Sequence, residues 1–302
     1  MDDELKPTSP PGRADPPDRG GSRVVERVIT PQAVMEGAGV RLMRSIATPT
    51  LDYVDPFLLF DHFGSDEPTD YLAGFPWHPH RGIETVTYLL TGEVRHGDSL
   101  GNQGTIGPGE VQWMTAGRGI IHEEMPQSTG RLRGLQLWVN LPARSKLTAP
   151  RYRGLTAPEI PTAILADGVQ ARVVSGEIDG VRGPLQDLVA APRFLHLSCS
   201  PAASVFLPLP PAHNAFGYVL DGEGAFGPEP VQRVPAGELV IFGQGEGIWL
   251  QAGRGGLELL LASGQPLGEP VAWGGPIVMN TDAELSSAYA EYHAGTFLSH
   301  SR

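Results

Sequence analysis

The stretch Tyr88-Leu-Leu-Thr-Gly-Glu-Val94 decides the fold, because a close copy of it, Tyr218-Val-Leu-Asp-Gly-Glu-Gly224, follows at an offset of 218 − 88 = 130. Downstream, Pro108-Gly-Glu-Val111 matches Ala236-Gly-Glu-Leu239 at an offset of 236 − 108 = 128. Both copies keep glycines at equivalent places, as expected where the same turns need a positive φ or a close backbone approach. The repeat therefore predicts two similar β domains side by side.

Short alternating segments separated by Gly- and Pro-bearing turns surround both copies. The chain has 39 Gly and 29 Pro among 302 residues, and only 19% of its residues are charged, which favours many short strands over helices. We predict an all-β protein built from two β-barrels. The segments expected to form strands are 23–29, 40–46, 85–90, 110–114, 132–141, 169–175, 194–199, 216–220, 238–242 and 257–262.

The domain organisation follows from composition. Residues 1–22 carry five prolines and almost no large apolar side chain, so we expect a disordered tail. Residues 23–145 are expected to form the first domain and 146–302 the second, with a proline-bearing linker over 142–161. Thr281 followed by Glu284 predicts a capping box. The helix that it starts has an apolar face, made of Leu285, Ala288, Tyr289 and Tyr292.

Charge and cysteine content exclude several classes of protein. The net charge of −12 argues against direct binding to nucleic acid, which needs Lys and Arg to neutralise phosphates, and against an anionic membrane surface. No apolar run approaches the roughly 18 residues of a spanning helix. The single cysteine, Cys199, excludes an internal disulfide and fits a reducing compartment. We therefore expect a cytoplasmic protein.

Four residues of the first repeat are candidate metal ligands. In His78-Pro-His80 the two imidazoles are two residues apart, so on a strand they point to one face. His122 and Glu124 share a face by the same parity. Three imidazoles and one carboxylate suit Fe, Mn, Ni, Cu or Zn rather than Mg or Ca. An octahedral metal would keep two positions open for water, O₂ or a substrate oxygen.

The second repeat has lost all four candidates. The offset of 130 carries His78 and His80 onto prolines, and the offset of 128 carries His122 and Glu124 onto apolar residues; these positions are Pro208, Pro210, Leu250 and Ala252. Residues needed only for folding should not all be present in one copy and all be replaced in the other. We therefore predict one metal, in the first domain.

Two further residues near the candidate ligands have more than one interpretation. Arg81 could steady a substrate phenolate or a ligand carboxylate, or it could anchor a loop by a salt bridge. Gln136 lies on the polar face of the strand at 132–141, and it is a candidate substrate contact if that face points inward.

Several motifs closely resemble those of the pirin family in the cupin superfamily. They are His78-Pro-His-Arg-Gly-Ile-Glu-Thr-Val-Thr-Tyr88, Gln112-Trp-Met-Thr-Ala-Gly-Arg-Gly-Ile-Ile-His-Glu-Glu-Met-Pro126, Leu135-Gln-Leu-Trp-Val-Asn-Leu141 and Gly275-Pro-Ile-Val-Met-Asn-Thr281. The resemblance implies a monomeric bicupin with one metal, usually iron, in the N-terminal barrel. It implies the ligands His78, His80, His122 and Glu124. Many other cupins use a carboxylate at the position of Glu84, which the pirin pattern leaves beside the ligands.

The resemblance implies three functions that the sequence does not separate. The first is cleavage of a flavonol-type aromatic substrate by O₂, as in quercetin 2,3-dioxygenase, with release of carbon monoxide. Glu124 or Glu84 would accept the substrate proton. The second is an iron-binding, redox-sensitive regulator that acts through protein partners. The third is another cupin activity, such as isomerisation at a redox-inert metal, which zinc would favour.

Overall fold

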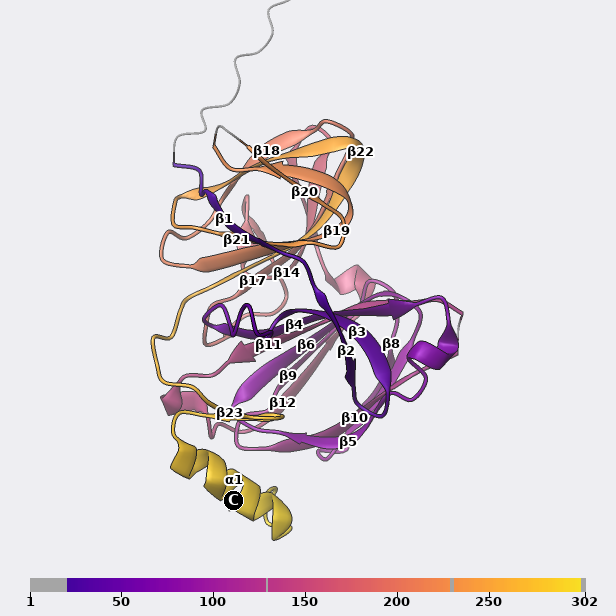
Figure 1. Cartoon of the computed structure of the whole chain (residues 1–302), viewed down its shortest axis with the longest axis vertical. Coiled ribbons are helices and arrows are strands. Elements are labelled where there is room, and N and C mark those ends of the chain that lie inside the picture. The colour runs from indigo at the N-terminus through magenta and orange to yellow at the C-terminus, as the bar shows by residue number, and fades with distance from the viewer. Residues whose placement is uncertain (1–20, 129, 229–230, 300–302) are drawn as a thin grey trace, which may run out of the picture.

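The computed structural model describes residues 21–128, 130–228 and 231–299, and nearly all of the tail predicted at 1–22 lies outside this part of the chain. Two β-sheet domains lie end to end along the long axis, with one helix at the far end of the first domain (Figure 1). The prediction of a mainly β protein with two cupin-like domains and a short C-terminal helix is confirmed. No described helix is long and apolar enough to cross a membrane.

The first domain packs a seven-stranded sheet, ordered β12-β9-β6-β11-β4-β3-β2, against a four-stranded sheet, ordered β5-β10-β7-β8. All pairs are antiparallel. The strands of this domain are β2 (Gln32–Glu36), β3 (Val40–Ile46), β4 (Phe57–Ser65), β5 (Phe75–His80), β6 (Ile83–Thr91), β7 (Val94–Asp98), β8 (Gln103–Ile106), β9 (Val111–Thr115), β10 (Ile120–Pro126), β11 (Leu132–Asn140) and β12 (Arg151–Leu155). Short 3₁₀ turns are η1 (Pro68–Asp70), η2 (Ala143–Ser145) and η3 (Ala157–Glu159).

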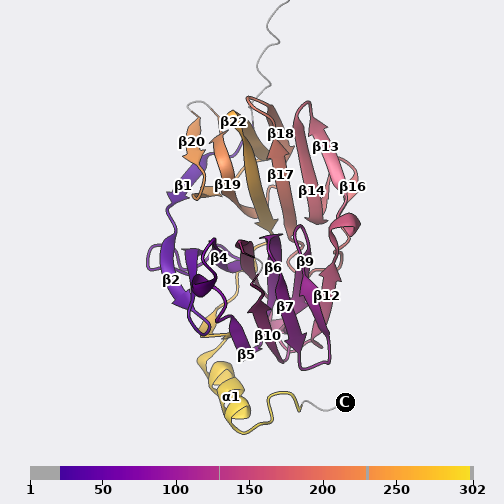
Figure 2. The same ribbon diagram turned by 90° about the vertical axis from the view of Figure 1, so that its right-hand side faces the viewer.

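The second domain is a nine-stranded sheet whose main path is β1-β21-β19-β22-β17-β14-β13, with β18 on β22 and β20 on β19 (Figure 2). Its strands are β1 (Val25–Ile29), β13 (Thr162–Ala166), β14 (Val169–Ser175), β17 (Arg193–Cys199), β18 (Ser204–Pro208), β19 (Asn214–Phe226), β20 (Gln232–Pro235), β21 (Leu239–Phe242) and β22 (Gly247–Gly264). A small hairpin adds β15 (Glu177–Ile178) and β16 (Val181–Arg182). Equivalent turn glycines adopt a positive φ in both copies: Gly92 and Gly222, Gly109 and Gly237.

The chain crosses between the two domains, so the predicted division at residues 145 and 146 does not separate the sheets in space. β1, expected in the first domain, pairs with β21 of the second. β12, in the segment expected to be a linker, pairs with β9 of the first. The alternation of polar and apolar residues cannot show which sheet a strand joins. The choice of sheet depends on the register with strands that are distant in sequence.

The two domains share an apolar core. Phe57 and Phe60 of β4 meet Phe216 of β19 edge to face, with ring centroids 5.2 and 5.3 Å apart. Polar groups close the rim of this contact: Arg172 of the second domain donates a 2.8 Å hydrogen bond to the hydroxyl of Tyr88 in the first. The two domains are therefore joined by a continuous packed interface and not only by a connecting segment of chain.

The interior of the second domain is filled by apolar side chains. Leu250 and Ala252, which stand where the first copy has His122 and Glu124, are buried in that cluster with Leu207 and Phe226. A close-packed interior of this kind leaves no polar groups for a metal. Among the described residues, the one group of histidines able to hold a metal lies in the first domain.

The C-terminal segment leaves the second domain and packs on the first (Figure 1). It contains β23 (Ala272–Gly274), β24 (Ile277–Met279) and α1 (Asp282–His293). The predicted capping box is present: Glu284 N donates to Thr281 Oγ1, and the Glu284 carboxylate accepts from Thr281 N. Ala288 of the predicted apolar face is buried in a cluster with Ile277 and Phe297, onto which Ile121 of β10 packs.

A buried lysine fixes the turn that follows the candidate ligand His80. Gly82, at φ +79°, lies in the turn between β5 and β6, and an added Cβ there would clash with Val278 O. The Lys146 ammonium donates to Gly82 O at 2.9 Å and to Asn140 Oδ1 at 2.5 Å. Burial lowers the pKa of Lys146 to about 7, and Glu269 is the main group opposing that shift.

We predict that Lys146 makes the free energy of unfolding depend on pH in the alkaline range. Because an unfolded lysine has a pKa of about 10.4, the unfolded state binds the proton more tightly, and the free energy of unfolding rises as the pH increases from about 7 towards 10. Relative to Lys146→Met, the native protein should gain up to about 3 kcal/mol between pH 7 and 9.5. Urea unfolding of both proteins across this range measures the difference; parallel curves would contradict the prediction.

Candidate metal centre

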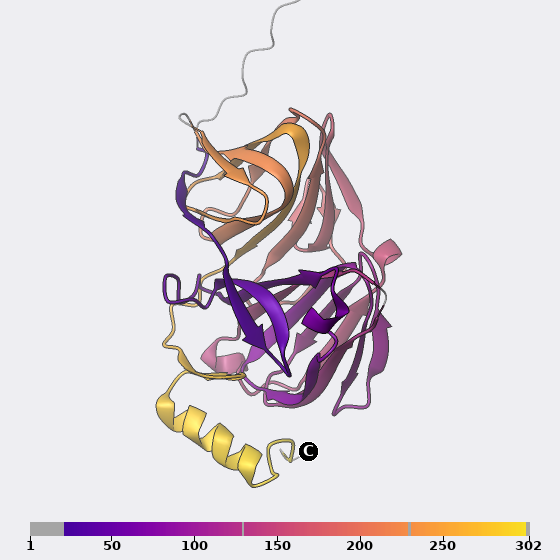
Figure 3. The ribbon, with the colours of Figure 1, turned by 45° about the vertical axis from the view of Figure 1, so that its right-hand side comes forward.

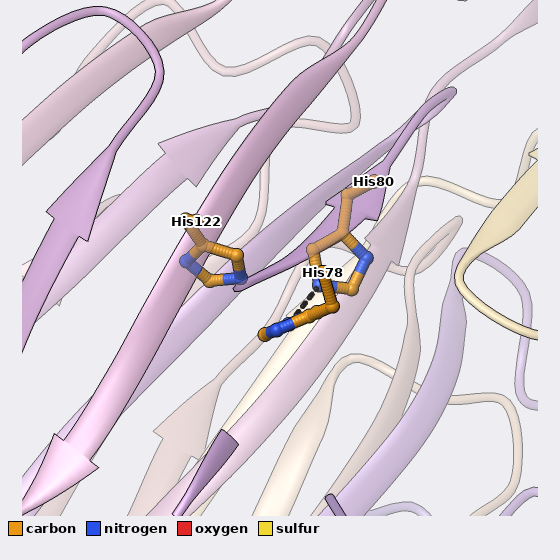
Figure 4. Close-up of side chains that lie close together, drawn as sticks. All are labelled: His78, His80 and His122. Atoms are coloured by element: carbon orange, nitrogen blue, oxygen red, sulfur yellow. Dashed lines mark hydrogen bonds between the residues drawn. The ribbon is translucent and has the colours of Figure 1, made fainter. Parts of the chain in front are cut away.

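Strand pairing brings the three histidines of the two motifs together. β5 and β10 are antiparallel neighbours, with His122 opposite His78 and Ile120 opposite His80. Because side chains on one face of paired strands lie close, the three imidazoles converge, as Figure 4 shows. Their ring centroids are 4.4 to 5.0 Å apart, and their ligand nitrogens lie within 4.8 Å of one another.

Hydrogen bonds to backbone carbonyls select which nitrogen each of two rings presents. His78 Nδ1 lies 2.8 Å from Pro76 O, and His80 Nδ1 lies 3.2 Å from Pro276 O. A carbonyl only accepts, so both Nδ1 atoms carry a proton, and Nε2 is the nitrogen that each ring turns toward the cluster. The two Nε2 atoms are 3.1 Å apart, along the dashed line of Figure 4.

This arrangement fits a metal ion. Two ligand nitrogens at about 2.1 Å from one ion and at right angles to each other are about 3 Å apart, close to the separation of the two Nε2 atoms. Both ring nitrogens of His122 are buried and have no hydrogen-bond partner among the described residues, which is costly unless a ligand supplies one. Burial lowers the pKa of His80 and His122 well below the ordinary histidine value. Both rings are therefore neutral, as metal ligands must be.

Glu124 lies beside this three-histidine cluster. It is fully buried on β10, where the pairing with β5 shifts between His122 and Glu124. Its Oε1 accepts a 2.7 Å hydrogen bond from Thr87 Oγ1, and its Oε2 accepts a 3.0 Å bond from Gln136 Nε2. Burial raises the pKa of Glu124, although both hydrogen bonds oppose that shift. Its role as fourth ligand stays a prediction.

Gln136 faces the interior of the first domain, as the polar face of its strand suggested. Besides its bond to Glu124, it is paired in register with Thr87 on one side and with Asp61 on the other. Asp61 forms a buried ion pair with Arg44, at 2.7 Å. Burial raises the pKa of Asp61 to about 6 despite that partner. Thr87, Gln136 and Asp61 therefore form a row of polar side chains across three neighbouring strands of the seven-stranded sheet.

The structure does not bring Glu84 to the cluster. β5 ends at His80, the turn at Gly82 interrupts the strand, and β6 starts a new alternation, so parity does not carry over from His80 to Glu84. Glu84 shares its face of β6 with Val86 and Tyr88, which belong to the core between the domains. Its Oε1 accepts a 2.6 Å hydrogen bond from Thr115 Oγ1. Its predicted role as proton acceptor has no support from this placement.

A cavity of about 620 Å³ opens beside the cluster, within the range of small-molecule sites. His78, His80 and Glu124 line it together with Gln136 and Trp138. The ring of His80 meets Trp138 edge to face at 5.0 Å. The cavity therefore offers polar groups at the cluster and aromatic surface next to it.

Sequence reasoning missed several residues of the cavity wall. Trp273 and Pro276 reach it from the C-terminal segment, and Arg44 and Asp61 reach it from β3 and β4. The motif at 275–281 was one available signal for the C-terminal contribution. Arg81, for which two roles were open, forms an ion pair with Glu291 at 2.7 Å, which is the anchoring role.

Two cupin-like sheet domains, with a three-histidine cluster found in the first, define a bicupin with one candidate metal centre. One family model, described as pirin, matches residues 39–139, and a second, described as the pirin C-terminal cupin domain, matches residues 194–298. A pirin-like protein from Solanum lycopersicum is 43% identical over 276 residues, 90% of this chain and 92% of the relative. The chain belongs to the pirin family.

The fold of this chain also resembles that of solved structures. A quercetin 2,3-dioxygenase from Acinetobacter baumannii superposes with a TM-score of 0.83 at 31% identity, over 91% of this chain and 98% of that one. A bacterial pirin from Escherichia coli, in complex with nickel(II), gives a TM-score of 0.64 at 19% identity, over 80% of this chain and 99% of that one. The second likeness, at this low identity, is one of fold.

We predict that removing any histidine of the cluster abolishes tight metal binding. His80→Ala or His122→Ala leaves only two of the three imidazoles, whereas Glu84→Gln should keep the metal because Glu84 bonds to Thr115 on the other side of the sheet. Metal content after purification and dialysis, measured by inductively coupled plasma mass spectrometry, checks both parts. Full metal content in His80→Ala would refute the site.

Proposed function

We propose that this protein is a metal-dependent dioxygenase that opens the ring of flavonol-type substrates with O₂ and releases carbon monoxide. The observation that carries the proposal is the convergence of three imidazoles, two of them with Nε2 atoms 3.1 Å apart, beside a cavity of about 620 Å³. His78, His80 and Glu124 line the wall of that cavity. The likeness to the Acinetobacter baumannii quercetin 2,3-dioxygenase supports it.

The proposed cofactor is one transition metal, preferably iron, held by His78, His80, His122 and Glu124. The nickel(II) complex of the Escherichia coli pirin supports a metal of this class. When bound, the metal would act as a Lewis acid that lowers the pKa of the substrate hydroxyl and supplies the redox chemistry that O₂ requires.

In this proposal Glu124 takes the substrate proton. Its carboxylate is buried, its pKa is raised by that burial, and Thr87 and Gln136 each occupy one of its oxygens from the side of the large sheet. A raised pKa makes a carboxylate a better proton acceptor near neutral pH. The remaining lone pairs are available to a substrate hydroxyl in the cavity.

The aromatic side of the cavity suits a flat substrate. Trp138 packs on the His80 ring, and Trp273 packs on Trp138 with centroids 6.1 Å apart. Planar rings stack favourably on such surfaces, with gains of about 0.5–1.5 kcal/mol per pair. These residues would orient the substrate and exclude water, while Glu124 handles the proton.

We predict aerobic turnover of quercetin by the iron-loaded protein, followed as loss of flavonol absorbance with trapping of carbon monoxide. His122→Ala should abolish both signals, because it removes a metal ligand. Carbon monoxide absent from a reaction of the fully iron-loaded protein would overturn the dioxygenase proposal. That result would favour the alternative of a redox-sensitive regulator acting through a protein partner.

We further predict that Gln136→Leu lowers kcat while the metal is retained. The substitution removes the 3.0 Å hydrogen bond to Glu124 Oε2, and hydrogen bonds to charged groups contribute about 1.5–3 kcal/mol. We expect kcat to fall by about 10- to 100-fold. Steady-state kinetics at matched metal content measures the effect. An unchanged kcat would mean that Gln136 does not hold the proton acceptor in place.

A further inference from the structure

The C-terminal segment, residues 272–297, reaches the metal ligands from outside the first domain. It descends from the second domain, forms the β23–β24 hairpin beside the first, and ends in α1 (Figures 1 and 3). Three of its residues, Trp273, Gly275 and Pro276, line the cavity next to the cluster. One wall of the site is therefore made by a part of the chain almost 200 residues from the ligands of β5.

The two histidines of β5 are oriented in different ways. His78 Nδ1 bonds to Pro76 O, two residues away on the same strand, whereas His80 Nδ1 bonds to Pro276 O of the C-terminal segment. A bond of this kind fixes which ring nitrogen faces the metal and how the ring is turned. The orientation of His80 therefore depends on the position of the C-terminal segment.

Arg81, the residue next to His80, fastens that segment. Its side chain is 3% exposed, and Nη1 lies 2.7 Å from Glu291 Oε2 of α1. Nη2 donates to Phe297 O at 3.0 Å, and the guanidinium lies over the Phe297 ring at 4.2 Å. The backbone adds a bond from Val278 N to Arg81 O at 3.1 Å. One arginine thus binds the hairpin, the helix and the end of the segment.

We propose that Arg81 is a positioning residue for the metal centre. Through Glu291 and Phe297 it holds the C-terminal segment where the Pro276 carbonyl keeps the His80 ring turned with Nε2 toward the metal. This inference rests on the proposed metal site and not on the dioxygenase reaction.

The first test compares Glu291→Gln with Asp282→Asn in the full chain. Both neutralise a carboxylate of α1, but Asp282 is an exposed residue of the first turn, whereas Glu291 pairs with Arg81. Affinity for Co²⁺, measured by competition with a chelator, should fall about tenfold in Glu291→Gln, the lower end of the effects found for partners of metal ligands. Asp282→Asn should bind as the native protein does.

The second test is read from the metal-free protein, so it does not depend on activity. In ¹⁵N-histidine-labelled native protein, His80 should be the Nδ1–H tautomer with a proton protected from exchange. Glu291→Gln and Arg81→Gln should lose that protection, and Asp282→Asn should keep it. Glu291 is the first choice because its side chain is 35% exposed, whereas replacing the buried Arg81 threatens folding.

The outcomes separate this inference from the proposed function. A Glu291→Gln protein with native Co²⁺ affinity and a native His80 tautomer would overturn the positioning role. A native protein that binds no Co²⁺ would remove the proposed metal-dependent function, while the tautomer measurement would still decide whether the C-terminal segment orients His80.

Discussion

The candidate metal centre of the first domain is organised around the Nε2 atoms of His78 and His80, which lie 3.1 Å apart. Burial lowers the pKa of His80, so this ring is neutral and its Nε2 is an acceptor. The carbonyls of Pro76 and Pro276 accept from the Nδ1 atoms of His78 and His80, so both rings keep Nε2 turned toward the cluster. The register of β5 and β10 then adds His122, whose two ring nitrogens have no hydrogen-bond partner among the described residues and are free to face a metal.

The duplicated domain explains how this site is tolerated. Both copies use the same turns, with Gly92 and Gly222 at positive φ, yet one copy surrounds a cavity with polar groups at the cluster and the other is filled by apolar side chains. A cavity with buried polar groups costs packing and apolar burial. The filled second domain and the aromatic contact through Phe57, Phe60 and Phe216 supply that burial elsewhere in the chain.

Local pattern in the sequence was enough to predict the fold class, the helix with its capping box, and the convergence of His78, His80 and His122. The helix and the shared face of His78 and His80 depend on period and parity, which hold within one strand or helix. The approach of His122 to them depends on the pairing of β10 with β5. Glu84 shows the limit: parity failed across the turn at Gly82, where the alternation restarts. The partner of β1 and the carbonyl facing His80 depend on contacts about 200 residues apart, which no local pattern records.

The charges of the site constrain the substrate. Glu124 is a buried carboxylate whose hydrogen-bond donors, Thr87 and Gln136, are both neutral. Burying an anion with neutral partners is costly, and a divalent cation held by three neutral imidazoles would offset that cost. In the proposed metal-bound protein, one dication and one carboxylate would sum to a single positive charge beside the cavity. In the proposed reaction Glu124 accepts the proton of the substrate hydroxyl, so the substrate oxygen would face the metal as an anion while the total charge of the site stays the same.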